Sequence, residues 1–131
     1  MDILYDVGIN DINIKSMINM CPNLINLSKS EIENKINILE SIGCNKKHIK
    51  NIIISNPFYL DKITGDILKL IKRLKELGFD TLNILFDSNP YILNLDIYEI
   101  DNYVDSETRQ GKSVEQIVDN LSSNPILFNE M

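Results

Sequence analysis

The prolines and glycines of this chain recur at regular intervals, and this recurrence restricts the fold more than any other feature. The four prolines lie 35, 33 and 35 residues apart, and four of the five glycines lie 35, 35 and 33 residues apart. A two-residue deletion between the third of these glycines and the third proline explains both short intervals. Because self-similarity at a fixed period is typical of repeat proteins, the sequence predicts about four copies of one structural unit. The repeated positions are Gly8, Gly43, Gly78 and Gly111, with Pro22, Pro57, Pro90 and Pro125.

Apolar residues in the same register indicate that each unit contains a long helix. Residues 11, 7, 4 and 1 positions before a glycine follow a 3.6-residue period, so they mark one buried stripe. The third such helix carries Glu107 and Gln110 at its last two stripe positions, and we expect its C-terminal half to pack less. The stripe residues are Ile32, Ile36, Leu39 and Ile42, then Ile67, Ile71, Leu74 and Leu77, then Ile100 and Val104.

A shorter helix should precede each proline. The residue before a proline is excluded from the α conformation, so Cys21, Asn56, Asn89 and Asn124 should each end one of these helices. The apolar residues two and three positions after the proline should then plug the core. An isoleucine stands six residues after every repeated glycine, and we expect these four side chains to occupy like environments in one apolar seam. They are Ile14, Ile49, Ile84 and Ile117.

Helix start and stop signals fall between these stripes. Glycine can end a long helix in the left-handed conformation without steric strain. Two residues after each repeated glycine stands a candidate N-cap for the short helix, and Ser28, Asp96 and Thr64 are the corresponding candidates for the long helices. The candidate caps of the short helices are Asn10, Asn45, Asp80 and Ser113.

These signals together predict an all-α fold, an α-solenoid of either hand built from about four repeats of 33–35 residues. The units, roughly 1–22, 23–57, 58–90 and 91–131 with both ends incomplete, should form a single helical-repeat domain over residues 1–131. One unit cannot bury its stripe alone, so neighbours must stack. Since neither end carries a polar terminal cap, we expect an exposed apolar end that a homodimer would bury.

The repeated phrases resemble those of the mitochondrial transcription termination factor family, the mTERF repeats. The closest stretches are 74–80 and 88–93, and 55–60 and 123–127 repeat the second of them. The resemblance covers nearly the whole chain. It implies a solenoid of helical triplets whose third helix is the short turn after the proline. It also implies a non-enzymatic protein that binds double-stranded DNA or RNA, or protein partners, in transcription or related regulation of gene expression.

Composition and charge exclude several classes of protein. Thirteen Lys and Arg against nineteen Asp and Glu give a net charge of −6, which argues against a DNA coat protein driven by charge alone. No apolar run approaches the roughly 18 residues of a membrane span. The first residues lack the basic region of a signal peptide and the Arg-rich character of a transit peptide. Two cysteines are too few for a disulfide scaffold, so we expect a cytoplasmic protein.

Basic residues concentrate in the middle of the chain. Residues 45–80 carry eight Lys and Arg against four Asp and Glu, whereas residues 81–131 carry two against nine. Lysines near helix starts can contact a phosphate backbone, although a solvated surface that keeps the protein soluble has the same composition. The acidic C-terminal third, or an exposed terminal repeat, supports an alternative function as a protein–protein interaction module. The candidate nucleic-acid-binding residues are Lys46, Lys47, Lys50, Lys69, Lys72, Arg73 and Lys75.

No motif in the sequence indicates catalysis, a metal or a cofactor. His48 is the only histidine and has no partner at ligand spacing, and the two cysteines, which we expect to be half-buried, do not form a C-x-x-C pair. Phosphate-cradling glycine loops and nucleophile motifs are absent from the sequence. The aromatic residues Phe58, Tyr59 and Tyr91 could stack on bases, but their places in the turns favour a role in the core.

Overall fold

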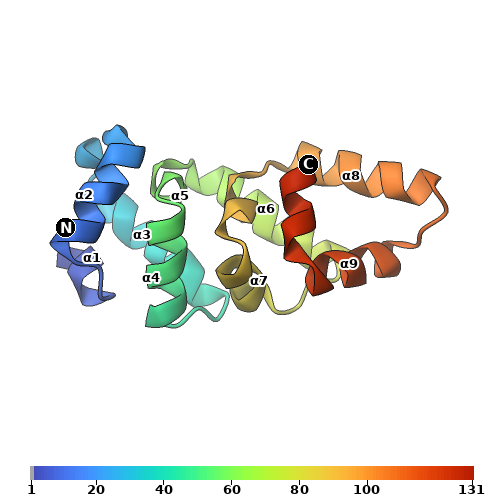
Figure 1. The fold of residues 1–131 in the computed structure, drawn as a ribbon, viewed down its shortest axis with the longest axis horizontal. Coiled ribbons are helices and arrows are strands. Elements are labelled where there is room, and N and C mark those ends of the chain that lie inside the picture. Colours follow the sequence, from blue (N-terminus) through green and yellow to red (C-terminus); the bar gives the residue numbers. More distant parts are fainter. Residues whose placement is uncertain (1) are drawn as a thin grey trace. The chain divides into compact units, whose positions relative to one another are not determined.

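The computed structural model describes residues 2–131, and these residues form helices and short connections with no strand among them. They make up two compact structural units, which are distinct from the shorter sequence repeats: the first ends at Thr64, and the second covers Gly65–Met131. The prediction of an all-α fold is therefore confirmed for the described residues. Figure 1 follows the order of the helices along the chain.

Both units alternate short helices, proline turns and long helices. The predicted third helix after the proline is present each time, either as a 3-10 helix or as the four-residue helix α5. The first unit contains α1 (Asp2–Asp6), α2 (Asp11–Met20), η1 (Pro22–Asn26), α3 (Lys29–Ser41), α4 (Lys46–Ser55) and α5 (Phe58–Asp61). The second contains α6 (Thr64–Leu77), which begins at the last residue of the first unit, α7 (Leu82–Ser88), η2 (Pro90–Asn94), α8 (Ile97–Arg109), α9 (Val114–Ser123) and η3 (Pro125–Glu130).

The prolines and glycines end the helices as predicted. Cys21, Asn56, Asn89 and Asn124 are the C-caps of α2, α4, α7 and α9. Their φ angles lie between −135° and −145°, because the ring of the following proline excludes the α conformation. The four repeated glycines have φ angles between +90° and +113°, the left-handed region that a side chain would strain.

Five of the predicted N-caps form capping boxes. In each box the cap side chain accepts a hydrogen bond from the backbone N–H three residues later, and the side chain of that later residue accepts one from the N–H of the cap. Two amide donors that the helix itself leaves open are satisfied in this way. The five caps are Asn10, Ser28, Asn45, Asp96 and Ser113.

Two predicted caps are wrong. The N-cap of α7 is Thr81 instead of Asp80, and the Thr81 side chain makes no capping bond. Helix α7 has seven residues where α2, α4 and α9 have ten, because the two-residue deletion shortens the segment between Gly78 and Pro90 that contains it. Helix α6 begins at Thr64 itself, and the residue before it is Ile63, whose side chain cannot accept a hydrogen bond.

The expectation that Ile84 lines the apolar seam is also wrong. Ile14, Ile49 and Ile117 are buried, but Ile84 is 59% exposed. Leu82 is buried in its place, because Leu82 stands eight residues before its proline, as the three buried isoleucines do. The register of the short helix is therefore counted back from the proline and not forward from the glycine.

The long helices bury the predicted stripe except at its last position, where Ile42 and Leu77 are only half-buried. In α8 the stripe is interrupted as expected, since Glu107 is half-buried and Gln110 is exposed. The proline turns contribute the side chains of Tyr59, Ile92 and Phe128, all of which are completely buried. Buried stripe residues are Ile32, Ile36 and Leu39 in α3, Ile67, Ile71 and Leu74 in α6, and Ile100 and Val104 in α8.

The register of α7 can be tested by comparing two alanine substitutions in the second unit. Ile117→Ala removes a buried side chain and should lower the free energy of unfolding by about 2–5 kcal/mol. Ile84→Ala, at the position that matches Ile117 when counted from the glycine, should change it by less than about 0.5 kcal/mol. Urea denaturation followed by circular dichroism measures both. Equal losses would contradict the register described here.

Candidate functional site

Helix α4 carries three of the predicted phosphate-binding lysines at its start. Lys46, Lys47 and Lys50 are all exposed. The capping box that begins this helix is formed by Asn45 and His48: the N–H of His48 donates to Asn45 Oδ1 over 2.9 Å, and the N–H of Asn45 donates to His48 Nδ1 over 3.2 Å. The only histidine thus helps to start the helix that carries the lysines, a role that the sequence analysis missed.

Lys50 lies beside the turn between α1 and α2. A Cβ atom built on Gly8 would stand 3.7 Å from Cδ of Lys50, so the aliphatic part of this side chain covers the glycine. The residue as a whole remains exposed. Long basic side chains commonly pack their methylene groups on apolar surface while the charged end stays in water.

Helix α6 carries the other four predicted residues, and the structure separates one of them from the rest. Lys69, Lys72 and Lys75 are exposed. Arg73 is about one-third exposed, and its Nε donates to Oδ1 of Asp101 on α8 over 2.7 Å. No pattern in the sequence indicates this ion pair, because it joins residues 28 positions apart.

The seven candidate residues are therefore divided between the two units, three on α4 and four on α6. We call them the α4 lysines (Lys46, Lys47 and Lys50) and the α6 basic residues (Lys69, Lys72, Arg73 and Lys75). Each group lies on one helix, so each forms a local basic surface by itself.

The three candidate aromatic residues differ in exposure. Tyr59 is a core residue as expected, and its hydroxyl donates to the backbone carbonyl of Lys35 over 2.7 Å. Burial raises the pKa of the Tyr59 phenol far above its usual value, and the nearby Cys44 adds to the shift. Phe58 and Tyr91 are each 44% exposed, so the expectation that they plug the core is wrong. Both directly follow a proline, a position that points outward in these turns.

The cysteines are more buried than expected. Cys21 and Cys44 both belong to the core of the first unit. Burial raises the pKa of the Cys21 thiol, and the negative charge of Asp61 acts in the same direction. Residues 2–131 contain no group of three or more His, Cys, Asp or Glu side chains placed to hold a metal ion.

A polar pocket in the first unit, with a volume of about 420 Å³, was missed by the sequence analysis. Lys35 on α3 lines it and is only 4% exposed, and its Nζ donates to the carbonyl of Leu60 over 3.0 Å. Burial lowers the pKa of Lys35, while the carboxylates of Glu31 and Asp61 act in the opposite direction. One signal in the sequence was that Lys35 stands eight residues before its glycine, where the next repeat has the apolar Leu70.

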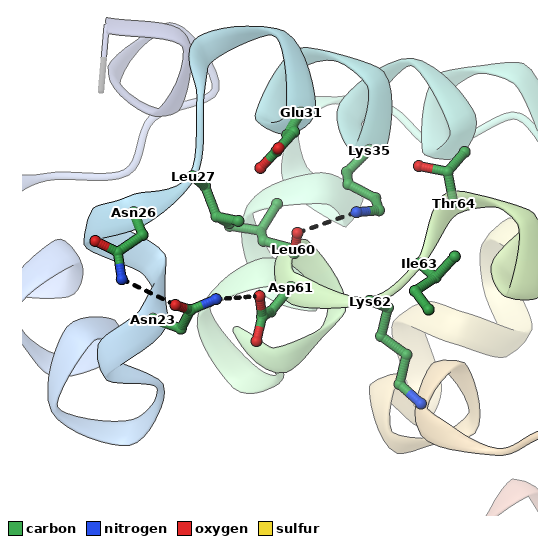
Figure 2. A pocket seen from close by; sticks show the side chains of 10 residues that line it. All are labelled: Asn23, Asn26, Leu27, Glu31, Lys35, Leu60, Asp61, Lys62, Ile63 and Thr64. Carbon is green, nitrogen blue, oxygen red and sulfur yellow. Dashed lines mark hydrogen bonds between the residues drawn. The ribbon is translucent and has the colours of Figure 1, made fainter.

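A chain of side-chain hydrogen bonds forms the other wall of this pocket. Asn26 Nδ2 donates to Asn23 Oδ1 over 2.9 Å, and Asn23 Nδ2 donates to Asp61 Oδ1 over 2.7 Å. Figure 2 shows Glu31 and Lys35 on α3 and, across Leu60, the amide chain that ends on Asp61. The residues that line the pocket thus include two lysines, Lys35 and Lys62, and two carboxylates, Glu31 and Asp61.

Comparison with known proteins identifies the family. No curated protein and no solved structure matches this chain. Within the part of the chain that the structure describes, no helix combines the length and the apolar character that crossing a membrane requires. A family model described as mTERF matches residues 1–129, nearly the entire sequence. The chain therefore belongs to the mTERF family, as its repeated motifs had indicated.

Proposed function

We propose that this protein is a non-enzymatic module that binds double-stranded DNA or RNA in transcription or related regulation of gene expression. Its membership of the mTERF family, a family of helical-repeat proteins, supports the proposal. The single structural observation that carries it is the exposure of six of the seven candidate basic side chains on two helices. Arg73 is the exception.

The α4 lysines are placed to meet phosphates. Lys46 and Lys47 are the first two residues of α4, and Lys50 lies one turn later. The start of a helix carries a partial positive charge from its aligned peptide dipoles, and this charge adds to that of the lysines. Phosphate contacts of this type give affinity without sequence preference.

The α6 basic residues can contribute a second set of contacts. Lys69, Lys72 and Lys75 follow each other at intervals of three residues, so their Cα atoms advance by about 4.5 Å along the helix axis from one to the next. Neighbouring side chains at this interval lie close together on the helix surface. They can therefore reach successive phosphates of a backbone that runs along α6.

The acidic background should limit this binding to local contacts. The second unit carries six Lys and Arg against twelve Asp and Glu, so its overall charge repels nucleic acid. Asp101 also holds Arg73 by the ion pair described above. We therefore expect affinity to depend on the individual lysines and to fall steeply with salt concentration.

Charge reversal of the α4 lysines tests the proposal against a control with the same change in net charge. The double variant Lys46→Glu/Lys47→Glu should bind a DNA or RNA duplex at least about tenfold more weakly, because two phosphate contacts are lost. The plot of log K against log salt should become shallower by about 1.8, since each phosphate contact contributes about 0.9. Fluorescence anisotropy of a labelled duplex measures both. The control is Lys15→Glu/Lys29→Glu, two exposed lysines outside the candidate set.

Equal weakening in the two double variants would show that only net charge matters and would contradict a site on α4. Absence of binding by the unaltered protein at low salt would overturn the proposed function. The alternative, a protein–protein module, would then be favoured by the exposed acidic residues of the second unit, such as Asp105, Glu115 and Asp119.

The ion pair between Arg73 and Asp101 leads to a second prediction. Asp101→Asn should strengthen duplex binding by about fivefold, because it releases the Arg73 guanidinium for a phosphate. The matched control is Asp105→Asn, which removes the same charge from an exposed position on the same helix. A gain of equal size in both variants would mean that Asp101 acts only through its charge and not through Arg73. The same anisotropy assay at fixed salt measures the difference.

A further inference from the structure

The polar pocket of the first unit lies where the chain departs from its own repeat. Four positions around it carry residues unlike their counterparts in the other sequence repeats, and three of the four line the pocket. Directly before the proline stands Cys21 where the other repeats have Asn56, Asn89 and Asn124, and directly after it stands Asn23 where they have Phe58, Tyr91 and Ile126. Four residues after the proline stands Asp61 where the other repeats have Asn26, Asn94 and Asn129. Eight residues before the glycine stands Lys35 where the other repeats have Leu70 and Tyr103.

The second unit shows what the usual residues do. Nδ2 of Asn89 donates to Oδ1 of Asn129 over 3.0 Å and to the carbonyl of Pro125 over 2.9 Å. These bonds join the end of α7 to the next proline turn, η3. A neutral pair of amides is thus sufficient to hold two successive turns together.

In the first unit Cys21 and Asp61 occupy the positions of that amide pair. A thiol is a weak hydrogen-bond donor, and Asp61 accepts its bond from Asn23 instead. The structural link between the turns is therefore kept, but a carboxylate has been introduced at its end. One oxygen of Asp61 bonds Asn23, which leaves the second oxygen for another donor.

Lys35 introduces the opposite charge. Its counterpart Leu70 is buried in the second unit, and Lys35 is buried as well. Burying an ammonium group is costly unless its donors are satisfied. Of its three N–H donors, the carbonyl of Leu60 accepts one. A leucine here would fill the same place without that cost, so the lysine needs another explanation.

We propose that this pocket binds a free α-amino acid with an aliphatic side chain. The carboxylate of the ligand would accept from the Nζ of Lys35, and its ammonium group would donate to Asp61 and Glu31. The side chain would lie against Leu27 and Ile63, the apolar residues that line the same pocket. A volume of about 420 Å³ is in the range of small-molecule sites.

The arrangement of charges favours a zwitterion over a singly charged ligand. A lone anion would face Asp61 and Glu31, and a lone cation would face Lys35 and Lys62, so each would meet charges of its own sign. A zwitterion pairs both signs with charge-assisted hydrogen bonds, which are the strong ones. This site is independent of the proposed nucleic-acid contacts, which involve other residues.

Calorimetric titration of the full chain with L-leucine, L-valine and L-alanine tests the proposal. We expect at least one of the three to bind with a dissociation constant on the order of 1 mM or lower. Two analogues of leucine, 4-methylpentanoate and 3-methylbutylamine, lack the ammonium and the carboxylate respectively, and should bind at least about tenfold more weakly. The proposal is overturned if none of the amino acids binds at about 10 mM, or if the amine binds as well as leucine.

The chain supplies its own matched variants. Lys35→Leu and Asp61→Asn introduce residues that other sequence repeats carry at these positions, so both variants should keep the fold. Each should weaken amino-acid binding by at least about tenfold, and thermal unfolding checks that the helices remain. Lys29→Leu removes the same charge from an exposed position of α3 that does not line the pocket, so this control should bind nearly as before. If both pocket variants bind leucine as tightly as the unaltered protein, the four unusual residues serve only to hold the turn.

Discussion

The structure depends on the exclusion of the residue before each proline from the α conformation. Four times along the chain this constraint ends a short helix at an extended residue and sends the chain into a tight turn. The turn then places a large side chain, such as Tyr59, Ile92 or Phe128, completely inside the core. The residue that ends the short helix and the buried side chain of the turn are only a few residues apart. Each repeat therefore forms its turn through local contacts, and the long helix packs on that turn.

The same constraint explains how the repeat tolerates a deletion. Helix α7 is shorter than the other short helices and Asp80 does not cap it, yet Leu82, Leu85 and Phe86 remain buried because their distance to the proline determines which way they face. The glycine end of the unit adapts instead, and Ile84 turns toward solvent. Because the proline sets the register of the short helix, this helix can change length at its N-terminal end while its core residues stay buried.

Charge is arranged locally in this protein, although its net charge is negative. The α4 lysines lie in the first turns of their helix, and among the α6 basic residues Arg73 is paired with Asp101 on α8. The polar pocket follows a different principle, since it balances Lys35 and Lys62 against two carboxylates. The first arrangement suits a phosphate backbone and the second suits a small zwitterion, which is why we assign them to different ligands.

The sequence alone determined the helical repeat, its period, its stops and most of its caps, because these depend on residues at most a few positions apart. The stripe predicted for α6 leaves Lys69, Lys72 and Lys75 outside the buried positions, and these lysines are exposed. Only the tertiary structure decided that Ile84 is exposed, that Arg73 bonds Asp101 and that Lys35 is buried against Leu60. The last two contacts join residues 28 and 25 positions apart, and such pairs are decided by how helices pack and not by the pattern along any one of them.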